Sequence, residues 1–220
     1  PDILQAYPMS HNYSIHRYVS LKIGVIFLIS AVALIYFVDR ILHQNALHEA
    51  RKRADILLNQ NMAIHTYSTN QLKPHLFRYI DPDETFDPVL MSSTYAVREI
   101  HRYLKDLQKD EYYYKECAIN ARNPANEADA MENAFLRQLN GTGSKETFSG
   151  IREIDGSPYY VLMKKGETIE KMCLRCHDTP ERAPAGLVAD YGPTRSFGRK
   201  VGEVVSAVSI RIPVAEAYSE

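Results

Sequence analysis

The run Cys173-Leu174-Arg175-Cys176-His177 constrains this 220-residue chain more than any other feature. Two thiols three residues apart, followed at once by a histidine, form the C-x-x-C-H pattern typical of covalent haem c attachment. Each thiol can form a thioether with one haem vinyl group, and His177 then lies beneath the iron as its proximal ligand. A redox dithiol would need a β-α-β context, and a zinc site a second pair of ligands. The sequence therefore predicts one haem c per chain, held by Cys173 and Cys176.

Composition and cysteine usage agree with this interpretation. Haem c is attached outside the bacterial cytoplasmic membrane, so the motif predicts a periplasmic domain. Only Cys117 remains as a third cysteine, which leaves no disulfide framework. The 26 basic and 27 acidic residues nearly balance, which argues against a nucleic-acid partner. The apolar content of 45% supports a packed core, and the length allows one domain plus an anchor.

An apolar run near the N-terminus predicts that anchor. Residues 19–38 are apolar apart from Lys22 and a few small residues, and about 20 helical residues span a ~30 Å hydrocarbon core. A cleaved signal ending near Ala33 is the alternative, but the apolar run continues past that point. Basic residues lie on both sides of the run, so the positive-inside rule does not favour an outside C-terminus. The haem motif does favour it, because a cytoplasmic C-x-x-C-H motif would receive no haem. We expect a cytoplasmic tail (1–18) and a single-pass helix (19–38) in the bacterial inner membrane, with the lipid bilayer as one partner.

A long helix is predicted next, over residues 39–72. Six residues follow a heptad-like spacing on one side of it: Leu47, Ala50, Ala54, Leu57, Asn61 and Ile64. One interpretation is a helix that packs this stripe on its own domain. The alternative is a homodimer through this juxtamembrane helix, with Asn61 fixing the register. The stripe ends near Pro74, which should break or kink the helix.

The last segment, residues 73–220, predicts helices mixed with antiparallel strands. Helices are expected over 91–107 and 127–139, strands over 111–119, 147–153, 159–164 and 204–212, and a proline- and glycine-rich loop over 180–202. Asp155-Gly156 between two of the strands is a strong hairpin signal. The predicted fold is α+β, with a small antiparallel sheet and flanking helices after the transmembrane helix.

Several short motifs occur along the soluble part of the chain, each once and in a defined order. They are Tyr114-Lys115-Glu116, Asn123-Pro124 with Asn126, Cys173 to His177 with Pro180, Ala183-Pro184, Tyr191-Gly192-Pro193, Phe197-Gly198 and Gly202-Glu203. In this order they resemble the PAS-like c-type haem domain family, over about residues 54–213. That family includes periplasmic haem sensor input domains and stand-alone cyanobacterial-type monohaem cytochromes. The resemblance implies a PAS-like domain over 73–220 whose sheet forms one wall of the haem pocket, with Cys173 and Cys176 carrying the haem and His177 as proximal ligand.

The motif leaves the distal iron ligand open. Some stand-alone family members use a cysteine at a position near Tyr95, where this chain has none. His65 is one candidate, its alternative role being a solvated or propionate-bound histidine. Met91 is another candidate, and an open distal pocket with Tyr95 as its gate is a third possibility. Three further candidates are expected in other roles: His75 and His101 at the surface, and Cys117 packed in the core.

Two functions compete on this sequence. The first is a membrane-anchored monohaem cytochrome that passes single electrons to redox partner proteins or within a membrane redox complex. The second is the input domain of a haem-based redox or gas sensor. Sensors continue from the last strand into a second span and an output domain, whereas this chain stops at Glu220, which favours electron transfer if the chain is whole. No acid–base pair, phosphate loop or nucleophile accompanies the motif, so no enzyme is expected.

Overall fold

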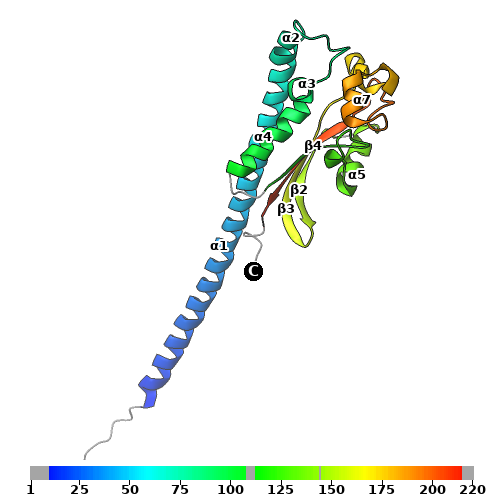
Figure 1. Ribbon diagram of the computed structural model, residues 1–220. Coiled ribbons are helices and arrows are strands. Elements are labelled where there is room, and N and C mark those ends of the chain that lie inside the picture. The colour runs from blue at the N-terminus through cyan, green and yellow to red at the C-terminus, as the bar shows by residue number, and fades with distance from the viewer. Residues whose placement is uncertain (1–9, 108–111, 144, 215–220) are drawn as a thin grey trace, which may run out of the picture. The chain divides into compact units, whose positions relative to one another are not determined.

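The computed structural model describes residues 10–107, 112–143 and 145–214, with side chains from residue 15 (Figure 1). The chain divides into two compact units, Pro1–Ala46 and Leu47–Glu220. The longer helices and the strands are α1 (Ser10–Tyr67), α4 (Ser93–Leu107), β1 (Tyr113–Ala118), α5 (Ala130–Leu139), β2 (Thr147–Ile154), β3 (Ser157–Lys165), α7 (Ala185–Tyr191) and β4 (Ser206–Pro213). Short helical segments are η1 (Ser68–Leu72), α2 (Lys73–Leu76), α3 (Pro88–Met91), η2 (Pro124–Asn126), η3 (Lys171–Cys173), α6 (Leu174–His177) and η4 (Pro180–Arg182).

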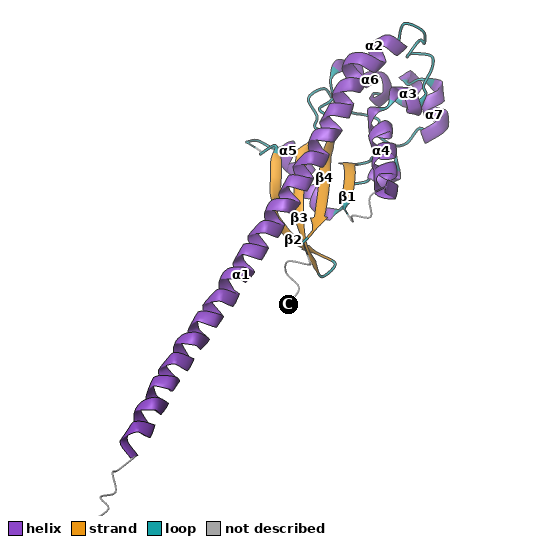
Figure 2. Ribbon diagram, turned by 90° about the vertical axis from the view of Figure 1, so that its left-hand side faces the viewer, coloured by secondary structure: helices purple, strands orange, loops and turns teal. Residues whose placement is uncertain are grey.

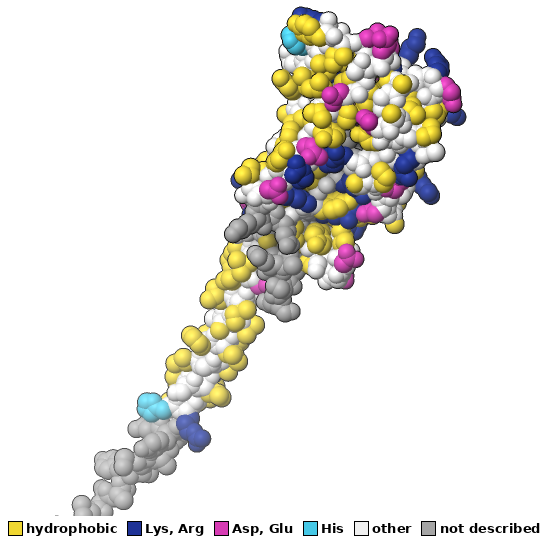
Figure 3. All heavy atoms as spheres, viewed as in Figure 1, with side chains coloured by type: hydrophobic (Ala, Val, Ile, Leu, Met, Phe, Trp, Pro, Cys, Tyr) yellow, Lys and Arg dark blue, Asp and Glu magenta, His cyan; other side chains and the backbone are white. Residues whose placement is uncertain are grey.

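The first unit is helical from Ser10 onward. Large apolar side chains are exposed along it between Ile15 and Leu42, and Figure 3 shows such side chains on the face of the helix turned toward the viewer. Within the described residues, this is the one helix long and apolar enough to cross a membrane. The ammonium group of Lys22 lies 4.4 Å from the centre of the Tyr18 ring, a cation–π contact that accommodates the charge. The long apolar N-terminal helix is therefore present as predicted.

Pro74 widens the helix instead of ending it. The turn η1 before it is π-helical, and the Lys73 N–H donates to the Ser68 carbonyl five residues back. Proline lacks an N–H and its ring collides with the carbonyl four residues earlier, so the regular ladder cannot continue. The chain nevertheless stays helical through α2 to Leu76. The helix therefore does not break at Pro74, and the structure shows a local change of pitch before it instead.

Four antiparallel strands form one sheet in the order β1-β4-β3-β2 (Figure 2). Strands β2 and β3 form a hairpin in which Ile154 pairs with Ser157. Asp155 and Gly156 between them have φ of 51° and 76°, the two left-handed positions that a type I′ turn requires. The four predicted strands and the hairpin are confirmed, and the fold is α+β.

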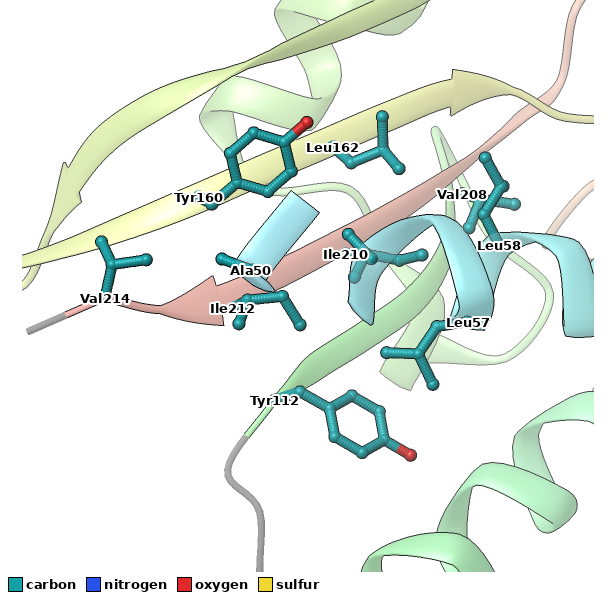
Figure 4. Close-up of a cluster of buried hydrophobic side chains, with 11 residues drawn as sticks. Ala50, Leu57, Leu58, Tyr112, Tyr160, Leu162, Val208, Ile210, Ile212 and Val214 are labelled. Atoms are coloured by element: carbon teal, nitrogen blue, oxygen red, sulfur yellow. The ribbon is translucent and has the colours of Figure 1, made fainter. Parts of the chain in front are cut away.

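The sheet separates two apolar clusters, because side chains alternate between its faces. On one face, Leu162 and Ile210 of the sheet pack against Leu57 and Leu58 of α1 (Figure 4). On the other face, the intervening residues of the strands pack against α5: Cys117, Val161, Met163 and Ala207 meet Phe135, Leu136 and Leu139. Burying one such Leu or Phe side chain contributes about 1.5–3 kcal/mol. The α1 stripe is therefore used within the chain, as the first of the two interpretations had it.

Three local predictions differ from the structure. The helix expected over 91–107 is interrupted at Ser92, which is extended and accepts a hydrogen bond from the Tyr95 N–H, so it caps α4. The helix expected from residue 127 begins at Ala130, because the Asp129 carboxylate caps it. The loop expected over 180–202 contains η4 and α7. The Ser92 and Asp129 caps explain the first two boundaries, which the apolar periodicity did not show.

Candidate functional site

The C-x-x-C-H motif occupies two consecutive short helical segments, η3 and α6. Residues three and four apart face the same side of helical backbone, so Cys173 shares a side with Cys176 and His177. Both thiols are half-buried and form no disulfide. Burial raises the pKa of the Cys176 thiol, which keeps it protonated at neutral pH. Two adjacent thiols beside an imidazole are the groups that double thioether attachment of haem requires.

The His177 ring is oriented by a backbone carbonyl. Its Nδ1 lies 2.7 Å from the Ser196 carbonyl oxygen and 3.2 Å from Ser196 Oγ. A carbonyl can only accept, so Nδ1 carries the proton and donates it, and Nε2 keeps its lone pair. Burial lowers the pKa of His177 to about 4, and the Arg122 and Arg199 charges also lower it, so the ring is neutral at pH 7. A neutral imidazole with Nδ1–H held by a carbonyl is the form that binds a metal through Nε2.

Arg122 connects the motif to the loop that carries Ser196. Its Nη2 donates to the Cys176 carbonyl at 2.6 Å and lies 3.4 Å from the Ser196 carbonyl and from His177 Nδ1. The guanidinium also lies over the Phe197 ring, 4.7 Å from its centre. Sequence reasoning missed Arg122, because a single arginine 54 residues before Cys176 carries no local signal.

The loop around Ser196 packs against the motif through backbone hydrogen bonds and two left-handed residues. Ser196 has φ of 62°, a left-handed conformation that is strained for a residue with a side chain, and Gly198 has φ of 70°. The Gly198 N–H donates to the Asp178 carbonyl at 2.6 Å, and the Arg199 N–H donates to the His177 carbonyl at 3.0 Å. These bonds hold the loop against the end of α6. Ser196 was also missed from the sequence, although the neighbouring Phe197-Gly198 was singled out.

Tyr95 lies near the other aromatic residues of this region. The Arg98 guanidinium stacks 4.7 Å from the centre of the Tyr95 ring. Burial raises the pKa of Tyr191, while the charges of Arg98 and Arg122 lower it, so both arginines act on the same phenol. Tyr191 also packs edge-on against Phe86, with ring centres 6.1 Å apart. The structure thus brings the start of α4, the end of α7 and Arg122 into one region. The distal-pocket role of Tyr95 stays a prediction.

Met91 and His65, the two predicted distal ligands, are engaged by other groups. The Met91 sulfur accepts a hydrogen bond from the Asp87 N–H at 3.3 Å. His65 Nε2 lies 2.6 Å from Glu116 Oε1, and burial lowers its pKa less than the bond and the charge of Glu116 raise it. Among the described residues, no hydrogen bond, ion pair or ring contact joins His65 or Met91 to His177. Their roles as ligands stay predictions.

Glu116 is the centre of a buried polar network that sequence reasoning also missed. Its carboxylate accepts from Asn61 Nδ2 at 2.7 Å and from the Tyr114 hydroxyl at 2.9 Å, besides His65. The Asn61 amide also contacts the Tyr114 hydroxyl. Burial raises the pKa of Glu116, but the bonds from His65 outweigh it, so the pKa is lowered and the carboxylate is ionised. Asn61 therefore has hydrogen-bond partners within its own chain.

His101 was expected at the surface, and this expectation was wrong. Only 3% of His101 is exposed, its ring stacks on Tyr114 with centres 3.6 Å apart, and its Nδ1 lies 3.1 Å from the Tyr112 hydroxyl. Burial lowers the pKa of His101 to about 4. His75 is exposed on α2, and Cys117 is fully buried, where its thiol donates to the Ala207 carbonyl. The packing role predicted for Cys117 is confirmed.

The donor set fits haem c better than a bound metal ion. Within residues 15–107, 112–143 and 145–214, no group of three or more His, Cys, Asp or Glu side chains is arranged to hold an ion. The motif instead supplies two thiols for covalent attachment and one oriented imidazole for an iron that a porphyrin brings. If a haem is bound here, Cys173 and Cys176 would be its attachment points and His177 would be a ligand of its iron.

A family model and one solved structure show what this chain is similar to. A search of curated proteins gives no match. Among solved structures, the chain is similar to the one described as "Crystal structure of the cyanobacterial heme-protein Tll0287", with a TM-score of 0.52 and 17% identity. The similarity covers 75% of this chain and 95% of the other, and at this identity it shows the fold. The family model described as Tll0287-like matches residues 43–213, so this chain belongs to the Tll0287-like family.

Proposed function

We propose that this chain is a monohaem c-type cytochrome that transfers single electrons. Cys173 and Cys176 attach the haem, and His177 binds its iron from the proximal side. The observation that carries the proposal is the bond from His177 Nδ1 to the Ser196 carbonyl, beside two free thiols on the same helical turn. The structural relative is itself a heme-protein, which supports the identity of the group. Bound haem would supply a one-electron couple at its iron.

The residues around the motif would keep the proximal side rigid during electron transfer. The Ser196 carbonyl fixes the tautomer and the orientation of His177, and Arg122 holds the Cys176 carbonyl. The two backbone bonds from residues 198 and 199 hold the same loop against α6. We propose that the sheet and its flanking helices form a PAS-like pocket around the haem, as the order of short motifs implies. Redox chemistry of this kind requires no acid–base residues, so we propose a carrier and not an enzyme.

We further propose that residues 19–38 anchor the protein in the bacterial inner membrane, with the haem domain in the periplasm. The exposed apolar side chains of this segment support the proposal, since a continuous apolar surface of this kind is unfavourable in water and marks a contact with a membrane or a partner. The partners would then be redox proteins or a membrane redox complex that reach the haem near the lipid surface.

A haem-based sensor is the second candidate, and the pairing of His65 with Glu116 supports it. The bond to Glu116 stabilises the protonated imidazolium, which has no lone pair for iron. A distal position that neither His65 nor Met91 takes would be open to a small gaseous ligand. A haem-based sensor needs such a position, whereas an electron carrier benefits from two strong protein ligands.

The attachment of haem is tested by replacing the motif thiols. We expect the wild-type chain, produced with a c-type haem maturation system, to gain the mass of one haem and to retain it in acidic acetone. Cys173→Ala with Cys176→Ala should lose all covalent haem, because no thioether can form. Mass spectrometry and the pyridine haemochrome spectrum measure both results.

The matched control is Cys117→Ala, which removes the one thiol outside the motif. This variant should keep its covalent haem, since Cys117 is buried against Ala207 in the second apolar cluster. An anaerobic redox titration of the wild type should then fit a single one-electron step. Haem that extracts freely from the wild-type chain would refute the proposed function.

A further inference from the structure

Arg122 differs from the other arginines near the motif in having no carboxylate partner. Four arginines of this region are ion-paired: Arg175 with Asp83, Arg182 with Asp178, Arg195 with Glu127 and Arg199 with Glu203. In the part of the chain that the structure describes, no Asp or Glu oxygen lies within ion-pair distance of Arg122. Its positive charge is therefore not neutralised by the protein.

The surroundings of Arg122 are neutral groups. The guanidinium contacts the carbonyl oxygens of Cys176 and Ser196 and the face of the Phe197 ring. Its Nε is buried and has no hydrogen-bond partner. A guanidinium stays charged in proteins even when burial disfavours the charge. A permanent cation thus lies 3.4 Å from Nδ1 of His177, in a half-buried position where water screens it poorly.

We propose that Arg122 raises the reduction potential of the haem site through its charge. This inference rests on the proposed function, in which His177 binds the iron. The oxidised site carries one more positive charge than the reduced site, so a nearby cation destabilises the oxidised form. A positive charge beside His177 therefore favours the reduced form of the haem site.

A second effect of Arg122 acts in the same direction. The Ser196 carbonyl lies within hydrogen-bonding distance of both His177 Nδ1–H and Arg122 Nη2. Sharing this acceptor weakens the His177 bond, and a weaker bond makes the imidazole a poorer electron donor to a metal. A poorer donor stabilises the oxidised metal less. Arg122 is thus a positioning residue that acts on the iron through His177.

The test compares the midpoint potentials of the full-length protein with those of Arg122→Gln and Arg122→Lys, each loaded with haem. Glutamine keeps a hydrogen-bond donor and removes the charge, so the potential should fall clearly below that of the wild type. Lysine keeps the charge, so most of the loss should be restored. An unchanged potential in Arg122→Gln, or equally low potentials in both variants, would overturn the proposal.

Arg195→Gln is the matched control, since Arg195 precedes Ser196 in the loop that faces the motif but is paired with Glu127. Removing a charge that is already neutralised should lower the potential much less. An equal fall in Arg195→Gln would mean that Arg122 has no special role.

A second pair of variants leaves Arg122 in place and covers the case in which Arg122→Gln fails to retain haem. Phe197→Glu would place a carboxylate beside the guanidinium, and Phe197→Gln is its neutral counterpart of the same size. The potential should be lower in Phe197→Glu than in Phe197→Gln, and equal values would contradict the inference. Covalent haem content is measured first, so a wild-type chain without haem refutes the proposed function and is distinct from a failure of the Arg122 inference.

Discussion

At the scale of single residues, His65 decides between the two proposed functions. The sequence predicts a low-spin, six-coordinate haem with His65 or Met91 as distal ligand, and such a haem should not bind carbon monoxide readily. On this prediction, His65→Ala opens the distal position, because the lost imidazole has no replacement. The ferrous variant should then become high-spin and bind carbon monoxide, which its absorption spectrum reports.

His75→Ala serves as the control for His65, because His75 is exposed on α2 and its replacement disturbs no core contact. The buried His101 would be a poor control, since its removal leaves space beneath Tyr114. A wild-type ferrous spectrum that shifts fully with carbon monoxide would contradict the prediction and favour the sensor. An unchanged low-spin spectrum in His65→Ala would instead exclude His65 and direct the test to Met91.

At the scale of elements, the start of α5 couples a helix cap to the sheet. The Asp129 carboxylate accepts from the Glu132 N–H at 2.9 Å, the Glu132 carboxylate accepts from the Asp129 N–H, and Asp129 also pairs with Arg211 of β4. Asp129→Ala should lower the free energy of unfolding by about 0.5–2 kcal/mol, the usual cost of a lost cap. Asp129→Asn should lower it less, because asparagine caps equally well and the largely buried Arg211 keeps its ion pair with Glu132. Denaturant unfolding at pH 7 in detergent measures both values.

The same carboxylate predicts a pH dependence whose sign can be worked out. Burial raises the pKa of Asp129, but the Glu132 N–H and the Arg211 charge outweigh it, so the folded pKa lies below 3.8. Its contribution is therefore complete well above pH 3.8 and is lost as the pH falls through the folded pKa. Asp129→Asn should lack this part of the acid sensitivity. Equal destabilisation by the alanine and asparagine variants at pH 7 would assign the effect to the ion pair alone.

At the scale of the whole molecule, the apolar helix should decide where the protein is found. We expect the full chain to remain in the membrane fraction after washes with high salt and alkali and to be released only by detergent. The reason is that about 20 apolar residues of a helix span the hydrocarbon core, and these washes remove only peripheral proteins. Immunoblots of the fractions measure this, with a known peripheral protein as the control. Recovery of a soluble form that begins after Ala33 would identify the segment as a cleaved signal.

Local signals in the sequence were sufficient to predict most of the helices and strands. The period-two apolar pattern predicts the strands, and Asp155-Gly156 predicts the hairpin, because both depend on residues close together in the chain. The heptad-like stripe of α1 predicts its buried face, and the structure supplies the sheet as its partner. The spacing of Cys173, Cys176 and His177 likewise predicts the chemistry of the site, since one helical turn brings them to one side. The boundaries at Ser92 and Asp129 were missed because a side-chain cap outweighs periodicity.

The two thiols and the imidazole of the motif, the apolar helix, the hairpin and the α+β class could all be predicted from the order of residues in the chain. The residues that surround the motif could not, because they depend on how distant segments pack. Arg122 and Ser196 meet across 74 residues of chain, and His65 meets Glu116 across 51. Such partners are chosen by the packing of α1 and of the loops against the sheet, a long-range arrangement that leaves no periodicity in the sequence. A buried polar group must find a partner wherever the fold brings one, so its identity becomes known only when the chain is folded.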